Sequence, residues 1–215
     1  MNRTAAASLI NSRVGRGRVD IDADILTELL LVQTTLEHEP TLPWFLLTTD
    51  ITITGPLTGF GDFNLPDDFL RMPEEDEGAL WVVDPSTGLY NQLDSQYSFV
   101  ELQKTFSSEA SGLPTNWSWG GLYGHVRPVP DLDYVFHMIY MAEDQDLSTD
   151  VENKWLKYAP EMIISKTVAN LANYLADNEL FDRASKDFQA AYARMIGENT
   201  ARSEAGRDRV RGDPD

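Results

Sequence analysis

Cysteine is absent from this chain of 215 residues. Its absence excludes disulfides, thiol nucleophiles and zinc sites built on thiolates. Long apolar runs are missing as well. The most apolar stretch, Ile25 to Val32, is interrupted by Thr27 and Glu28 and is far too short to cross a bilayer. No apolar segment follows the arginines near the N-terminus, so the pattern of a secretory signal is missing and we expect a soluble, intracellular protein.

Positive charge is scarce. The chain has 17 Lys and Arg against 35 Asp and Glu, which gives a formal net charge of −18 at pH 7. Tight non-specific binding to nucleic acid needs cations that displace counterions, so a protein that grips a duplex is disfavoured. An acidic surface is nevertheless suited to lining a passage through which DNA slides without sticking.

A recognisable metal or cofactor site is also lacking. The three histidines, His38, His125 and His137, do not have the i, i+4 spacing of a helical metal pair. Acids at 20, 22 and 24 resemble the start of a calcium loop, but Ile25 and Leu31 occupy the positions that require glycine and glutamate. We therefore expect no metal and no cofactor.

Two segments admit an enzymatic or ligand-binding interpretation. The acids Glu74, Glu75, Asp76 and Glu77 offer carboxylates for a cell-wall hydrolase, although catalytic pairs must face each other across a cleft and adjacent acids in a loop are usually solvated. Trp117 and Trp119 could stack on a sugar in a carbohydrate-binding module, or anchor a loop in a protein interface. Nothing in the sequence specifies an enzyme.

The ends of the chain have helical patterning, and the middle has strand patterning. Helices are predicted over 4–14 and from a cap at Asp20 or Asp22 to the prolines 40 and 43. A single helical turn is predicted at 64–70. Residues 95–106 are compatible with a short helix or a strand, and we favour the helix. Strands are predicted at 45–49, 51–54, 79–83, 122–126 and 134–141, with Val126, Pro128 and Pro130 at a sheet edge.

The last third contains two helices after a short one that Asp150 is expected to cap. Pro160 starts the first of the two, and its apolar residues cover about half the circumference, wider than a one-sided surface helix needs. We interpret this arc as a contact between protomers. It comprises Ile163, Ile164, Val168, Leu171, Tyr174 and Leu175.

Beyond Thr200 the apolar pattern ends and a basic tail is predicted. Its residues of interest are Arg202, Arg207, Arg209, Val210 and Arg211. Two interpretations stay open. The tail is either a solvated terminus or an element that becomes ordered when its arginines pair with a partner's carboxylates.

Four segments, in this order, give the chain a resemblance to a known family. Leu65 to Leu70 is similar to an "LP-x-DFL" element, and Gly124 to Pro130 to a "G-x-x-x-P-x-P" strand end. Ile139 to Ser148 is similar to a "Y-Y-x-x-x-x-L-S" segment, with Met141 in place of the second tyrosine, and Asn153 to Glu161 to an "N-x-x-L-x-x-x-P-D" helix entry. In these features the chain resembles the head-to-tail adaptor (connector, or head-completion) proteins of tailed bacteriophages, especially the short-tailed type.

The resemblance implies an α+β, mainly α fold: a bundle of about four helices with a β-rich insertion and an extended C-terminal tail. On this chain the bundle would comprise 4–39 and 150–200, within a single domain over 1–200, the insertion 44–141 and the tail 201–215. It also implies a non-enzymatic virion protein at the head-tail junction, made in the host cytoplasm.

The partners follow from the same resemblance. They are the portal protein, a tail (nozzle or tube) protein below, and further copies of the chain in a ring of about twelve. Double-stranded DNA would pass without tight binding, and no membrane is involved. The C-terminal tail would lie along the portal. The segment from Trp117 to Trp119 departs from the family's pattern, and we expect Trp117 and Trp119 to contact the tail protein from a loop. A stopper or tail-tube component is the alternative role.

Overall fold

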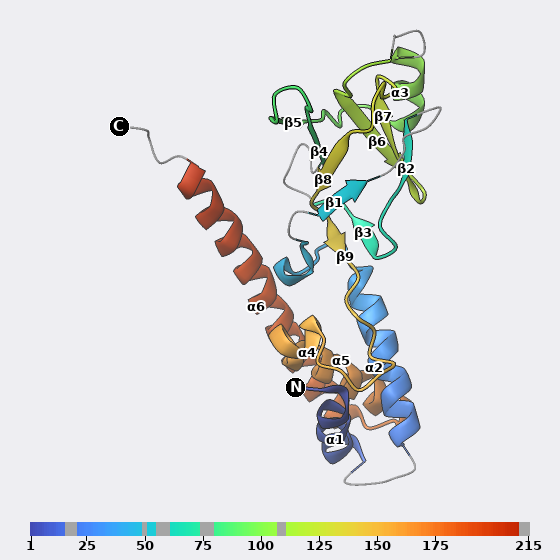
Figure 1. Ribbon diagram of the computed structural model, residues 1–215. Coiled ribbons are helices and arrows are strands. Elements are labelled where there is room, and N and C mark those ends of the chain that lie inside the picture. The colour runs from blue at the N-terminus through green and yellow to red at the C-terminus, as the bar shows by residue number, and fades with distance from the viewer. Residues whose placement is uncertain (16–20, 49–50, 55–60, 74–79, 107–110, 211–215) are drawn as a thin grey trace. The chain divides into compact units, whose positions relative to one another are not determined.

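The computed structural model describes residues 1–15, 21–48, 51–54, 61–73, 80–106 and 111–210 (Figure 1). The chain divides into two compact units. A helical unit is formed by Met1–Leu46 with Glu143–Asp215, and a β-rich unit by Leu47–Ala142. The fold is α+β, as the sequence indicated.

The helical unit begins with α1 (Arg3–Val14) and α2 (Asp22–Glu37). The side chain of Asn2 caps α1 by accepting a bond from the Ala5 N–H, and Gly15 ends the helix. The expected aspartate cap of α2 was wrong: Ile21 is the capping residue and makes no side-chain bond, while Asp22 lies in the first turn. There its negative charge is still favourable, because it faces the positive end of the helix dipole.

Three helices follow the return of the chain to this unit: α4 (Lys154–Tyr158), α5 (Pro160–Tyr174) and α6 (Asn178–Val210). Pro160 begins α5 as predicted, since its missing N–H costs nothing at that position. The cap of α4 is Asn153 and not Asp150. Asp150 instead accepts a hydrogen bond from the Thr4 backbone N–H at 2.9 Å and so ties α1 to this segment.

Helix α6 corrects the expectation of an extended segment from residue 201. The helix continues without interruption to Val210 (Figure 1). The loss of apolar periodicity after Thr200 ends the buried stripe, but alanine, arginine and glutamate at 201, 202, 204 and 205 are strong helix formers. The helical backbone therefore continues beyond the last residues with an apolar packing pattern. Residues 211–215, with Arg211, lie outside the described part of the chain.

Short strands in three antiparallel sheets build the β-rich unit, together with helix α3 (Phe99–Thr105). The first sheet has the order β1-β8-β4-β5, the second β2-β7-β6 and the third β3-β9. The strand bounds are β1 Ile51–Thr54, β2 Asp62–Asn64, β3 Phe69–Arg71, β4 Leu80–Val83, β5 Tyr90–Gln92, β6 Asn116–Gly120, β7 Tyr123–Arg127, β8 Val135–Met138 and β9 Met141–Ala142. Helix α3, predicted within 95–106, is stabilised by a capping box between Ser98 and Glu101.

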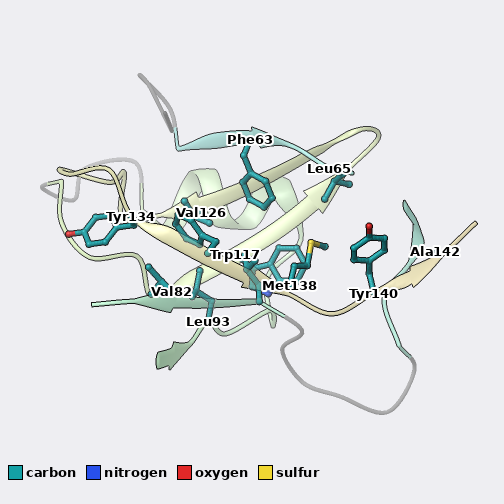
Figure 2. Close-up of a cluster of buried hydrophobic side chains, with 12 residues drawn as sticks. Phe63, Leu65, Val82, Leu93, Trp117, Val126, Tyr134, Met138, Tyr140 and Ala142 are labelled. Atoms are coloured by element: carbon teal, nitrogen blue, oxygen red, sulfur yellow. The ribbon is translucent and has the colours of Figure 1, made fainter. Parts of the chain in front are cut away.

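One apolar cluster forms the core of this unit. Trp117 is 1% exposed and lies among aromatic and aliphatic side chains from strands of all three sheets (Figure 2). Phe63 and Phe136 stack with ring centroids 6.2 Å apart. Because the strands are short, most of the apolar burial in this unit comes from side chains that converge on this cluster.

Three local predictions in the middle of the chain were wrong. Residues Trp44–Leu46 form a 3-10 turn, η1, where a strand was expected. The segment expected as a helical turn at 64–70 contains the end of β2, a turn and the start of β3, because Phe69 pairs with Ala142. Strand β7, expected at an edge, is central in its sheet, since the prolines come only after its last residue.

Candidate interaction surfaces

Exposed apolar side chains gather at the turn between α5 and α6. Tyr174 is 79% exposed, Leu175 40% and Phe181 36%; we call these three residues the α5–α6 tip. The turn is closed by two backbone bonds, from the Ala176 N–H to the Asn173 carbonyl and from the next N–H to the Ala172 carbonyl. Ala176 has a φ of 56° in this motif, a position that usually holds glycine.

The rest of the predicted protomer contact on α5 is not a free surface. Helix α5 packs against α1, α2, α4 and α6 within the same unit. Four residues of the arc are therefore buried by the chain itself: Ile163, Ile164, Val168 and Leu171. A central helix and an interface helix give the same wide apolar arc, and for these four residues the interface interpretation was wrong. Only Tyr174 and Leu175 remain accessible.

Aromatic side chains line a cavity of about 190 Å³ near the start of α5. The ring of Trp44 lies 5.1 Å from that of Tyr158, and Phe45 lies 5.5 Å from Tyr158, centroid to centroid. Met162 of α5 and Met195 of α6 add apolar lining. We call this cavity the Trp44 pocket. It is reachable from solvent, since Tyr158 is 47% exposed.

Charged side chains surround the Trp44 pocket. Arg194 and Glu161, both lining residues, form an exposed ion pair at 3.0 Å. The ammonium of Lys157 lies 5.0 Å from the centroid of the Tyr158 ring. Glu198 also lines the cavity. Such surface pairs contribute little to stability, but they set the electrostatic character of the pocket mouth.

Helix α6 contacts η1 and the residues before it through the pocket residue Trp44 and through Leu42. The Arg202 guanidinium lies 3.6 Å from the centroid of the Trp44 ring, a cation–π contact. The Asn199 side chain accepts from the Trp44 backbone N–H at 2.9 Å and donates to the Leu42 carbonyl at 2.8 Å. Arg202, predicted as a portal contact, therefore already has a partner within its own chain.

The other predicted tail residues are only partly described. Arg207, Arg209 and Val210 fall within the backbone of α6, but their side chains lie outside the described part of the structure. Arg211 lies outside it altogether.

The two tryptophans predicted to contact a tail protein from a loop have different environments. Both lie on strand β6, and Trp117 is a core residue, so the prediction of an interface role was wrong for it. Trp119 is 44% exposed and its ring lies 5.5 Å from that of Phe69. Nearby, Leu122 in the two-residue turn between β6 and β7 is 79% exposed, and Tyr123, the first residue of β7, is 52% exposed. We call Trp119, Leu122 and Tyr123 the hairpin patch.

The histidines have structural surroundings. His125 is buried, lies 2.7 Å from an Asp62 carboxylate oxygen and packs against the Phe99 ring at 4.1 Å. His38 Nδ1 lies 2.7 Å from the Thr34 carbonyl, and His137 packs against Tyr90 at 4.8 Å. Asp20 and the acids 74–77 lie outside the described residues. Across the part of the chain that is described, no three His, Asp or Glu side chains are grouped closely enough to hold a metal ion.

A buried carboxylate in the helical unit was not predicted from the sequence. Glu37, 7% exposed, accepts hydrogen bonds from the Gln33 amide at 3.0 Å, the Trp155 indole N–H at 2.8 Å and the Asp144 backbone N–H at 3.3 Å. Burial raises the pKa of this carboxyl above its ordinary value, although the three donors oppose the shift. The sequence carries no indication that Glu37 is buried, because a glutamate at the end of a helix before prolines is usually exposed.

The Trp44 pocket was missed because its parts are far apart in the sequence. Its aromatic rings come from residues 44–45 and 158, and the rest of its lining comes mainly from α5 and α6. Clustered aromatics beside a proline, as in Trp44 and Tyr158, are a weak signal that could have marked it.

In the described ranges, no helix is both long enough and apolar enough to span a membrane.

Comparison with known families agrees with the resemblance seen in the sequence. No curated protein matches the chain. A family model described as SU10 adaptor protein, however, matches residues 3–213, which is nearly the whole chain. The chain therefore belongs to the SU10 adaptor protein family, which makes it a structural component of a phage virion that contacts other virion proteins.

Proposed function

We propose that this chain is a head-to-tail adaptor whose copies form a ring beneath the portal, extend the DNA channel and provide the platform for the tail. The observation that carries the proposal is the family match over residues 3–213. A match that includes both units favours a role for the entire chain and not for one module of it. About twelve copies are proposed, in keeping with the resemblance stated above.

The negative charge supports a channel role. A ring of subunits that each carry −18 surrounds DNA with a repulsive field, so the duplex passes without being held. Binding to phosphates would instead need a surplus of lysine and arginine.

We assign the portal contact to the end of α6. The side chain of Arg202 is engaged on Trp44, so the segment available to a partner starts after it. Arg207, Arg209 and Arg211, with Val210 among them, supply guanidinium groups suited to bidentate pairing with carboxylates. We assign the tail contact to the hairpin patch, where Trp119 is accompanied by two further exposed apolar residues. Trp117 has no part in it.

The test is the mass of the complex formed on mixing the full chain with portal protein. A portal complex with a fixed number of bound copies is expected. Removing residues 204–215 keeps Arg202 and its contact with Trp44, so it should abolish portal binding while leaving the melting of the free chain nearly unchanged. Unchanged affinity after this truncation would refute the role of the segment. Association with a tail protein only, and none with portal, would favour a stopper or tail-tube role instead.

A further inference from the structure

We propose that the α5–α6 tip of one copy inserts Tyr174 into the Trp44 pocket of the next copy, so that this pair of surfaces is the repeating contact of the ring. The inference rests on the proposed function, because it specifies how copies of the chain meet. It assigns a role to a pocket and a tip that lie on the same unit and that the sequence did not connect.

The size of the pocket fits one side chain. At about 190 Å³ it is smaller than the cavities of about 300–1,000 Å³ that hold small-molecule ligands. It exceeds the cavity of about 150 Å³ that accommodates a benzene molecule. Its lining includes two aromatic rings, Trp44 and Tyr158, and the thioether of Met195, and aromatic walls favour an aromatic guest in an edge or offset arrangement.

The tip supplies a guest of that kind. Tyr174 is the most exposed aromatic side chain among the described residues, at 79%, and Leu175 stands beside it. Burying the ring of a solvent-exposed tyrosine at a helical turn lowers the free energy, and its hydroxyl can stay in contact with water at the edge of a pocket. Ala176 has a left-handed conformation that costs about 1–2 kcal/mol for a residue with a side chain, and the two backbone hydrogen bonds of the turn hold it there, so the tip has a defined geometry.

Charges on the two surfaces are complementary. Residues 174–182 contain three acids, Asp177, Glu179 and Asp182, and no lysine or arginine. The surroundings of the pocket carry three cations, Lys157, Arg194 and Arg202, against two carboxylates, Glu161 and Glu198. In a chain with a net charge of −18, a cationic surplus at an apolar pocket is a local departure that suits an acidic partner surface.

Geometry directs the tip to another copy. Pocket-lining Pro160 and Met162 begin α5, and Tyr174 ends it, so tip and pocket lie at opposite ends of one helix of 15 residues. That separation is about 22 Å at 1.5 Å per residue, and a rigid helix cannot bring its own ends together. A contact between two different patches on identical subunits is head-to-tail, and repetition of such a contact closes a ring when the rotation permits.

Because the chain has no cysteine, pairs of introduced thiols provide a direct test. Leu175→Cys is placed in the tip of one preparation and Glu198→Cys in the pocket of another. Oxidation of the mixture, assembled at high concentration or on portal protein, should give a disulfide-linked dimer that neither preparation forms alone. Asp187→Cys, on the exposed face of α6, replaces Glu198→Cys as the control and should not cross-link with the tip.

A substitution gives an independent measurement. Tyr174→Ala should weaken self-association about 30-fold, as expected for an aromatic residue at the centre of an interface. Tyr174→Phe should retain most of it. The melting temperature of the free chain should not change in either variant, because Tyr174 is 79% exposed. Leu89→Ala, in the β-rich unit and 64% exposed, serves as the matched surface control.

The outcomes separate this inference from the proposed function. If Tyr174→Ala leaves the assembly intact and no mixed cross-link forms, the tip-and-pocket contact is wrong, while the ring stands. A cross-link between Glu198→Cys and portal or tail protein in place of a second copy would also overturn the contact. If the unmodified chain forms no oligomer, alone or on portal protein, both this inference and the proposed ring fail.

Discussion

The two units each bury one tryptophan completely, but in different ways. In the helical unit the indole N–H of Trp155 donates to Glu37 at 2.8 Å. In the β-rich unit the indole N–H of Trp117 is buried and has no hydrogen-bond partner among the described residues. Trp155 is thus positioned by a hydrogen bond as well as by packing against Phe45, whereas the Trp117 side chain is positioned by packing.

This difference extends to the whole of each unit. The helical unit has long elements, with 15 residues in α5 and 33 in α6, and polar side chains fix where they meet. Strands of two to five residues make up the β-rich unit, which relies on one apolar cluster. The β-rich unit should therefore be most sensitive to lost volume in its cluster, whereas the helical unit, which also buries apolar side chains, should in addition be sensitive to the loss of a buried acceptor.

The largest effect is expected at Trp117. Trp117→Ala leaves a cavity in the cluster and should destabilise the β-rich unit by about 3–5 kcal/mol, measured by urea unfolding. Trp117→Phe should cost much less, because the lost N–H made no bond to the described part of the protein. Trp119→Ala is the matched control and should change stability little, since that side chain is 44% exposed. Equal losses for the two alanine variants would contradict the placement of the core.

A smaller effect is expected when the acceptor of the helical unit is removed. Glu37→Ala deprives the Trp155 N–H of its partner, and a buried donor left without one costs about 1–3 kcal/mol. Glu37→Gln keeps an acceptor oxygen and should lose less. Urea unfolding of both variants checks the order, and a Gln variant as unstable as the Ala variant would mean that the charge, and not the acceptor, matters.

Two exposed glycines should respond with opposite signs. Gly197 lies within α6 with open space around a new Cβ, so Gly197→Ala should stabilise the helical unit by about 0.5–1 kcal/mol. Gly121 has equally open surroundings but a φ of 60°, so Gly121→Ala should destabilise the β-rich unit by about 1–2 kcal/mol. Thermal unfolding measures both. A gain at both positions would show that the left-handed turn relaxes.

The least pronounced effect concerns pH. Burial raises the pKa of Glu37 above its ordinary value of 4.5, so the folded state binds the proton more tightly than the unfolded state. Stability from this group therefore increases as pH falls from neutrality through the raised pKa towards 4.5, and Glu37→Gln should remove that dependence. Asp150, whose pKa is lowered by hydrogen bonds from Thr4, acts oppositely and below 3.8. A wild-type profile parallel to that of Glu37→Gln above pH 4.5 would contradict the shift.

Sequence patterns predicted helix boundaries better than they predicted which side chains are buried and what covers them. Pro160 and Gly15 marked helix boundaries because their effects on the backbone are local. The apolar arc on α5 could not reveal whether α1, α2 and α6 or a neighbouring copy would cover it, since both give one periodicity. Trp117 and Trp119 share a face of β6, yet the cluster covers only the first of them. Burial of this kind depends on contacts between distant segments, and the sequence does not show those contacts directly.

Helix α6 has one more consequence. It starts beside the tip and continues for 33 residues, about 50 Å at 1.5 Å per residue, so under the proposed contacts it would fix the distance between the neighbouring copy and the portal. A four-residue insertion after Arg202 would advance the basic end by about 6 Å and rotate it by about 40°. Under these proposed contacts, the length of a single helix would set both the spacing and the angular register of the two neighbours.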